Sequence, residues 1–280
     1  MTRNRRPAVL VVHGSWHRPC HYELLSCRLR KLGFETACPA LPSIGKDRLG
    51  KTWQDDVQCI RDVALRLFAK NKQVLLLAHS YGGIPASIAT EGLTRPERAA
   101  AGLPGGFCHV AYMSAFALPA SGLSLLSAIG GSFPDWMEYG EVGGTAKDRS
   151  TSIKQTARQL LYNGVPDERA DWAMSKLVPQ SQLAVELPVP FAATDVIVPK
   201  TFVVCEQDLA MSVEVQEMIV AAVPGMRSER ISAGHSPFLS HPYALAQVVA
   251  TIARRAVMTV GDGQRDDLFQ DKAVPFGSVL

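Results

Sequence analysis

Residues 74–83 read VLLLAHSYGG and give the clearest indication of the fold. Its beginning, Val74–Ala78, is a run of five apolar residues and is typical of a buried strand. The continuation approximates the G-x-S-x-G elbow between a strand and a helix, with Ala78 in place of the first glycine. The turn must be sharp to lift the Ser80 hydroxyl above the sheet, so its neighbours must be small, and alanine meets that need. By itself the motif also fits a serine at an ordinary helix N-terminus.

On both sides of this stretch, short aliphatic segments alternate with segments of helical length. We expect strands at residues 8–12, 34–38, 74–78, 109–115, 201–205 and 227–231. We expect helices at residues 22–31, 54–69, 213–222 and 243–258, and one from the elbow to about residue 90. Such alternation predicts βαβ units, and therefore an α/β fold with a mostly parallel central sheet and helices on both faces.

The alternation breaks once, between residues 118 and 200. This segment has no strong strand pattern and carries helix-like stretches at residues 153–162 and 168–177. An insertion of this size is best interpreted as a helical cap over the carboxyl edge of the sheet, where open α/β sheets bind ligands. We therefore expect a core of residues 1–117 and 196–260, a cap of residues 118–195, and a flexible tail of residues 261–280.

A serine hydroxyl becomes a good nucleophile only beside a base that a third group orients. With an elbow of this type the chain order is serine, acid, histidine. His235 follows the last expected strand in a loop, although a histidine there could simply bond the backbone. Asp208 lies beyond the end of the strand at 201–205 and suits the far imidazole nitrogen, whereas we expect Glu206 to be solvated or to contact the next helix. The predicted catalytic residues are Ser80, His235 and Asp208.

Acyl transfer also needs two backbone N–H groups that stabilise the developing oxyanion. The elbow supplies the amide of Tyr81. The loop after the first strand, HGSWH at residues 13–17, supplies the second through Ser15, because Gly14 permits a tight turn. Taken alone, this loop fits an ordinary glycine turn almost as well.

Composition excludes several other classes of protein. The 29 Lys and Arg against 26 Asp and Glu leave a net charge of +3, which argues against a dedicated nucleic-acid binder. No apolar run exceeds six residues, which is too short to span a membrane. The six cysteines are scattered, and no N-terminal signal pattern is present, so we expect a cytoplasmic protein with reduced thiols. No cluster has metal-ligand spacing, and we expect no metal.

These motifs together resemble the α/β-hydrolase superfamily. They are HGSWH at residues 13–17, AHSYGG at 78–83, CEQD at 205–208 and AGHSPFL at 233–239. More narrowly the chain resembles the small esterase and hydroxynitrile lyase branch, with plant methyl-salicylate-type esterases and their fungal and bacterial relatives. The resemblance runs from about residue 8 to residue 256. It implies an α/β-hydrolase fold and a Ser-His-Asp site without a cofactor, under a mobile cap.

The resemblance further implies that the partner is a small-molecule substrate, an ester or a lactone, and it leaves open whether the chain forms a homodimer. Residues of the first loop and of the cap are expected to line an apolar pocket; these are Trp16, His17, Trp136, Tyr139 and Trp172. Two alternatives remain. One is a lyase of hydroxynitrile or retro-aldol type that uses Ser80 and His235 to move a proton, and the other is a ligand receptor with a nearly silent hydrolase site. The groups that would discriminate among them lie in the cap.

Overall fold

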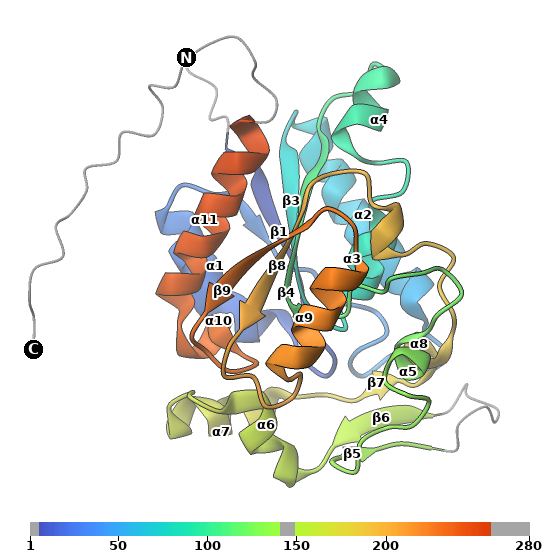
Figure 1. Ribbon diagram of the computed structural model, residues 1–280, viewed down its shortest axis with the longest axis vertical. Coiled ribbons are helices and arrows are strands. Elements are labelled where there is room, and N and C mark those ends of the chain that lie inside the picture. The colour runs from blue at the N-terminus through green and yellow to red at the C-terminus, as the bar shows by residue number, and fades with distance from the viewer. Residues whose placement is uncertain (1–5, 141–148, 259–280) are drawn as a thin grey trace, which may run out of the picture.

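The computed structural model describes residues 6–140 and 149–258. Its centre is a six-stranded sheet in the order β2-β1-β3-β4-β8-β9, in which every neighbouring pair is parallel (Figure 1). The strands are β1 (Ala8–Val12), β2 (Thr36–Ala37), β3 (Gln73–Ser80), β4 (Gly106–Ala115), β8 (Lys200–Cys205) and β9 (Met226–Ile231). The α/β-hydrolase fold expected from the sequence is confirmed. The central strands are buried on both faces, which explains their continuous apolar runs.

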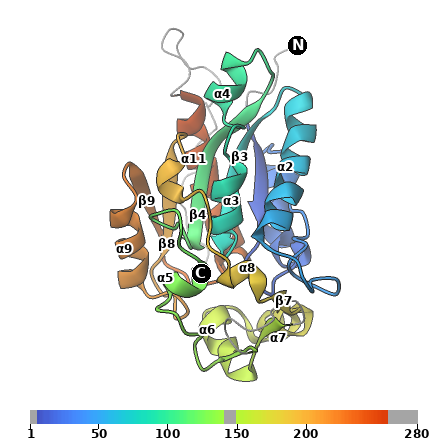
Figure 2. The same ribbon diagram turned by 90° about the vertical axis from the view of Figure 1, so that its right-hand side faces the viewer.

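Helices cover both faces of the sheet. Helices α1 (Glu23–Lys31) and α11 (Pro242–Met258) lie on one face, and α2 (Trp53–Ala69), α3 (Gly83–Ala89) and α9 (Val213–Ala222) lie on the other (Figures 1 and 2). The two apolar clusters that they form with the sheet are separate, one on each face. Shorter elements complete this part: η1 (Pro19–Tyr22), α4 (Arg95–Ala100) and α10 (Pro237–Ser240).

Helix α2 illustrates how the local sequence fixes an element. Thr52 caps its N-terminus, and the Asp55 carboxylate accepts a hydrogen bond from the Thr52 amide at 2.9 Å, which completes a capping box. Its apolar residues recur at helical spacing and face the sheet; they are Val57, Ile60, Ala64, Leu67 and Phe68. The helix therefore starts one residue before the range expected from the sequence and ends where that range ends.

The segment between β4 and β8 lies beyond the carboxyl ends of the strands (Figure 1). Its helical elements are α5 (Leu125–Ala128), η3 (Gln155–Ala157), α6 (Arg158–Tyr162), α7 (Asp167–Lys176), α8 (Leu183–Glu186) and η4 (Ala193–Asp195). It also contains an antiparallel sheet of β5 (Met137–Glu138), β6 (Ser150–Ile153) and β7 (Gln180–Ser181). The segment is thus mixed rather than purely helical. Strands of two to four residues carry too little alternation to be predicted.

The end of this segment is fastened to a loop of the core. The Ser181 amide donates to the Ser43 carbonyl at 2.7 Å, and the Gly45 amide donates to the Pro179 carbonyl at 2.9 Å. The division into core, cap and tail stays a prediction, and the expected tail at 261–280 lies outside the described residues. Among the described helices, none is both long and apolar enough to cross a membrane.

Candidate active site

Ser80 occupies a sharp turn at the end of β3. Its φ angle is 52°, in the left-handed region that a non-glycine residue rarely adopts, so the backbone is held there by its surroundings. Gly82 makes this turn possible, because a Cβ on it would lie 2.5 Å from the Val12 carbonyl oxygen and 2.7 Å from that of His13. Helix α3 begins directly afterwards at Gly83. The elbow predicted from residues 74–83 therefore has the geometry that lifts a serine side chain above a sheet.

Asp208 and His235 meet at the same edge of the sheet. Asp208 Oδ2 lies 2.8 Å from His235 Nδ1, and both side chains are buried. A carboxylate can only accept, so Nδ1 carries a proton in this pair, which leaves Nε2 of a neutral imidazole free to accept one. Asp208 lies in the loop after β8, and His235 in the loop after β9. The structure thus brings together the acid and the base expected from the sequence.

The Asp208 carboxylate is held from several sides. The amides of Ala210 and Met211 donate to its Oδ1 at 2.7 and 2.9 Å. The hydroxyl of Ser114 donates to its Oδ2 and lies 3.4 Å from His235 Nδ1. Burial raises the pKa of Asp208, but the positive charge of a protonated His235 and these hydrogen bonds lower it by more, so its net pKa lies below the usual value. Asp208 is therefore held as a carboxylate.

Ser114 belongs to the site although no motif pointed to it. It lies at the end of β4 with a φ angle of 41° and is completely buried. Strand β4 neighbours β8, whose following loop carries Asp208, so the two side chains meet at adjacent strand ends. The only sequence signal was a small polar residue at the end of an otherwise apolar strand.

Glu206, the competing acid, takes no part in this arrangement. It is exposed and forms an ion pair with Arg230 on β9, with 2.9 Å between Oε1 and Nε. His241 lies between helices α10 and α11.

The two predicted oxyanion-hole amides flank the elbow. Ser15 follows Gly14 in the loop after β1, and Tyr81 follows Ser80. A Cβ built on Gly14 would lie 3.0 Å from Ser80 Cβ, so this loop lies directly against the elbow. Within the described ranges, neither the Ser15 amide nor the Tyr81 amide donates a hydrogen bond to another protein group. Both N–H groups are thus free to bind a ligand oxygen.

Asp56 holds the side chain of Tyr81 through a hydrogen bond. The Tyr81 hydroxyl donates to Asp56 Oδ2 at 2.6 Å, and Ser43 donates to the same carboxyl through its hydroxyl and its amide at 2.6 and 2.9 Å. Asp56 is completely buried, and burial raises its pKa to about 6 in spite of these hydrogen bonds. No local sequence pattern indicates these contacts, because Ser43 and Tyr81 are distant from Asp56 in the sequence.

The five expected pocket residues lie in different surroundings. Trp16 is buried, its Nε1 lies 3.2 Å from both oxygens of Thr151 on β6, and its ring meets that of Trp136 edge to face at 5.8 Å. His17 is buried and bonded through Nδ1 to the Ser15 carbonyl. Tyr139 and Trp172 are partly exposed, with ring contacts to Phe133 and His21 respectively. The structure therefore brings the rings of Trp16 and Trp136 into contact, while His17, Tyr139 and Trp172 pack against other rings.

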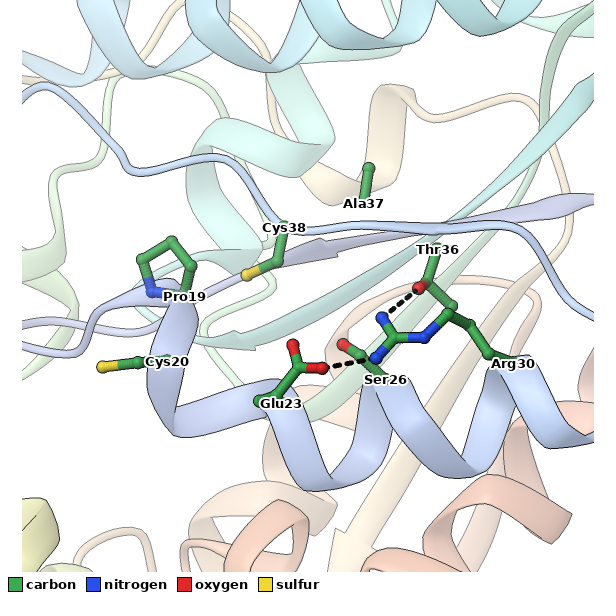
Figure 3. A pocket seen from close by; sticks show the side chains of 8 residues that line it. All are labelled: Pro19, Cys20, Glu23, Ser26, Arg30, Thr36, Ala37 and Cys38. Atoms are coloured by element: carbon green, nitrogen blue, oxygen red, sulfur yellow. Dashed lines mark hydrogen bonds and ion pairs between the residues drawn. The ribbon is translucent and has the colours of Figure 1, made fainter.

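A surface cavity of about 310 Å³ lies away from these residues, between α1 and the β2 strand (Figure 3). Arg30 crosses it and is paired with Glu23, while its Nη1 lies 3.3 Å from the Thr36 hydroxyl. The guanidinium is thus engaged by the protein itself. In the described part of the chain, no group of three or more His, Cys, Asp or Glu side chains is arranged to hold a metal ion.

Comparison with known proteins identifies the family. The Alpha/beta hydrolase family matches residues 9–248, most of the chain. The chain belongs to the alpha/beta hydrolase family. A relative from Aspergillus novofumigatus, "Alpha/beta hydrolase nvfD", is 32% identical over 90% of this chain and 98% of its own length.

Two further relatives lie in the esterase branch. "Methylesterase 17" of Arabidopsis thaliana is 26% identical over 85% of this chain and 88% of its own length. The crystal structure of polyneuridine aldehyde esterase superposes with a TM-score of 0.73 at 20% identity, over 89% of this chain and 99% of that one. The resemblance to the esterase branch and the expectation of a hydrolase-type enzyme are both confirmed.

Proposed function

We propose that the protein is a serine hydrolase that cleaves a small, largely apolar ester or lactone through an acyl-enzyme. One observation carries this proposal: a buried Asp208–His235 pair, 2.8 Å apart, lies at the sheet edge where Ser80 sits in a strained elbow. This combination is the arrangement that a hydroxyl needs in order to become a nucleophile. The names of the relatives support ester chemistry for this site.

The proposed reaction uses the residues at the carboxyl ends of β3, β8 and β9. His235 Nε2 removes the proton from the Ser80 hydroxyl as its oxygen attacks the carbonyl carbon, and the amides of Ser15 and Tyr81 bind the resulting oxyanion. The imidazolium then gives that proton to the leaving oxygen, and the C–O bond to the leaving group breaks. Water repeats the sequence on the acyl-enzyme and regenerates Ser80. Asp208 stabilises the imidazolium throughout and keeps Nδ1 protonated.

An apolar substrate is supported by the surroundings of the first loop. Trp16 belongs to the apolar cluster that continues from the sheet into the inserted segment, together with Leu125, Leu126 and Phe133, and Trp136 packs against this cluster. A ligand bound between the elbow and this cluster would meet aromatic and aliphatic surface. The cytoplasmic location expected from the cysteines remains part of the proposal, and all six are free thiols in the structure.

Covalent labelling tests the mechanism directly. The purified protein and its Ser80→Ala variant are incubated with a serine-directed sulfonyl fluoride, and their intact masses are measured. We expect one adduct on the wild type and none on the variant, with esters and lactones hydrolysed only by the wild type. Equal labelling of the two proteins, or ester turnover by folded Ser80→Ala, would overturn the proposal.

A further inference from the structure

Tyr22 lies at the centre of a hydrogen-bonded chain behind the proposed active site. It is completely buried, and its ring stacks on Phe238 with 4.1 Å between centroids. Its hydroxyl oxygen accepts the Gly14 amide at 3.1 Å and lies 2.7 Å from His79 Nδ1. The other nitrogen of that imidazole, Nε2, lies 3.0 Å from the His235 carbonyl oxygen. The hydroxyl and the imidazole therefore link two loops that are 221 residues apart in the sequence, from 14 to 235.

The direction of each bond follows from the chemistry of its ends. A carbonyl oxygen can only accept, so His79 Nε2 must carry a proton. Burial, reinforced by the nearby His235, lowers the pKa of His79 far below its usual value, so the ring is neutral and Nδ1 is an acceptor. The Tyr22 hydroxyl then donates to Nδ1 and accepts from Gly14. All three bonds run in one direction, from the Gly14 amide to the His235 carbonyl.

This hydrogen-bonded chain adjoins three parts of the proposed catalytic site: the oxyanion loop, the nucleophile and the base. Gly14 precedes Ser15, whose amide is a proposed oxyanion donor, and His79 precedes the nucleophile Ser80. The carbonyl that receives the last bond belongs to the proposed base, His235. Gly14 and His79 are tightly packed, because a Cβ on Gly14 would lie 2.8 Å from His79 Nδ1. A change in any one of these hydrogen bonds would thus move an oxyanion donor or the base relative to the nucleophile.

We infer that Tyr22 and His79 are positioning residues, which set the distance between the oxyanion loop and the catalytic histidine. This inference rests on the proposed serine hydrolase function. His79 is not a second base, since both of its nitrogens are already bonded within the protein. Misplacement of a reacting group by about 1 Å can cost 100-fold in rate, so a chain of this kind acts on turnover more than on substrate binding.

The first test removes a single oxygen atom. Tyr22→Phe keeps the ring on Phe238 but leaves the Gly14 amide without its acceptor. The matched control is Tyr112→Phe, because the Tyr112 hydroxyl is equally buried and bonded to Ser87 on α3 at 2.8 Å. With p-nitrophenyl butyrate we expect kcat to fall about 10- to 100-fold in Tyr22→Phe, with KM within about threefold of the wild type. Tyr112→Phe should keep the wild-type kcat, while the two variants lose similar amounts of Tm.

The second test asks whether Tyr22 acts through His79. His79→Gln can still reach the His235 carbonyl with its amide N–H, but it offers no acceptor at the position of Nδ1. If Tyr22 works through that nitrogen, the double variant Tyr22→Phe/His79→Gln is no slower than the slower single variant. Rate losses that multiply would show that the two residues act independently and would overturn the inferred chain.

The outcomes separate this inference from the function on which it rests. If the wild type neither forms a Ser80 adduct with the sulfonyl fluoride nor hydrolyses the ester, the proposed function fails and the positioning roles fail with it. If the wild type is active and Tyr22→Phe retains its kcat, or loses it only as far as Tyr112→Phe does, the function stands and the positioning roles are overturned.

Discussion

The hydroxyl of Ser114 donates a hydrogen bond to Asp208 Oδ2 at the ends of two neighbouring strands, β4 and β8. Both side chains are buried, and the same hydroxyl lies 3.4 Å from His235 Nδ1. The carboxylate therefore shares its oxygen between a hydroxyl and an imidazole. This third donor, besides two backbone amides on Oδ1, fixes the plane of the carboxylate toward the histidine.

Replacement of Ser114 by alanine removes that donor. A hydrogen bond to a charged group contributes about 1.5–3 kcal/mol, so we expect the free energy of unfolding to fall by about that amount. We also expect slower labelling of Ser80 by the sulfonyl fluoride, by about tenfold, because Asp208 orients His235 less well. Thr201→Val, which removes a buried hydroxyl bonded to His109 on the same sheet, serves as the control for stability. An unchanged labelling rate in Ser114→Ala would contradict this role.

Asp208→Asn should affect activity far more than folding. The amide is almost the same size but favours the wrong imidazole tautomer, and a loss of about 10³- to 10⁴-fold in kcat is expected for a triad of this type. Glu206→Gln is the matched control, because Glu206 lies two residues earlier and is exposed. Steady-state kinetics with the same ester compare the two variants. Comparable losses in both would mean that the acid was assigned to the wrong residue.

Gly82→Ala is expected to prevent the elbow from forming. The added Cβ would meet three carbonyl oxygens of the backbone, those of Val12, His13 and His79, at 2.5–2.9 Å. Since none of them can rotate away, we expect a loss of about 3 kcal/mol in the free energy of unfolding. Gly130→Ala, at a positive φ with open space around it, should lose only about 1 kcal/mol. Urea denaturation of both variants measures the difference.

The buried carboxyl of Asp56 predicts a pH dependence of stability. Its pKa rises from 3.8 to about 6 on folding, so between these values the unfolded state releases a proton that the folded state keeps. Stability contributed by this group therefore falls as pH rises from about 4 to 6 and then levels off, by about 3 kcal/mol in total. Urea midpoints of the wild type and Asp56→Asn, measured from pH 4 to 8, should show this slope only in the wild type. If the difference in urea midpoint between the two proteins stays constant from pH 4 to 8, the raised pKa of Asp56 is refuted.

The sequence predicted the framework of the fold well, because its central strands are long, apolar and buried on both faces. It also selected Ser80, Asp208 and His235 as the candidate catalytic residues, since chain order and loop position restrict the choice, and the structure places Asp208 beside His235. It did not reveal Ser114, Tyr22 or Asp56. Each of these acts through a contact with a residue distant in the sequence, and no local pattern records such a contact. The short strands of the inserted segment were not predicted for a related reason, because each of them forms only by pairing with a strand distant in the sequence.

The fastening of Pro179 and Ser181 to the loop at Ser43 and Gly45 has a consequence for protein engineering. That loop also bonds Asp56, which holds Tyr81 at the elbow. Both fastening bonds join backbone atoms, so they depend on where the chain runs and not on which side chains it carries. A segment exchanged for residues 118–195 between members of this family therefore keeps these bonds only if its backbone passes the loop at residues 43–45 in the same way.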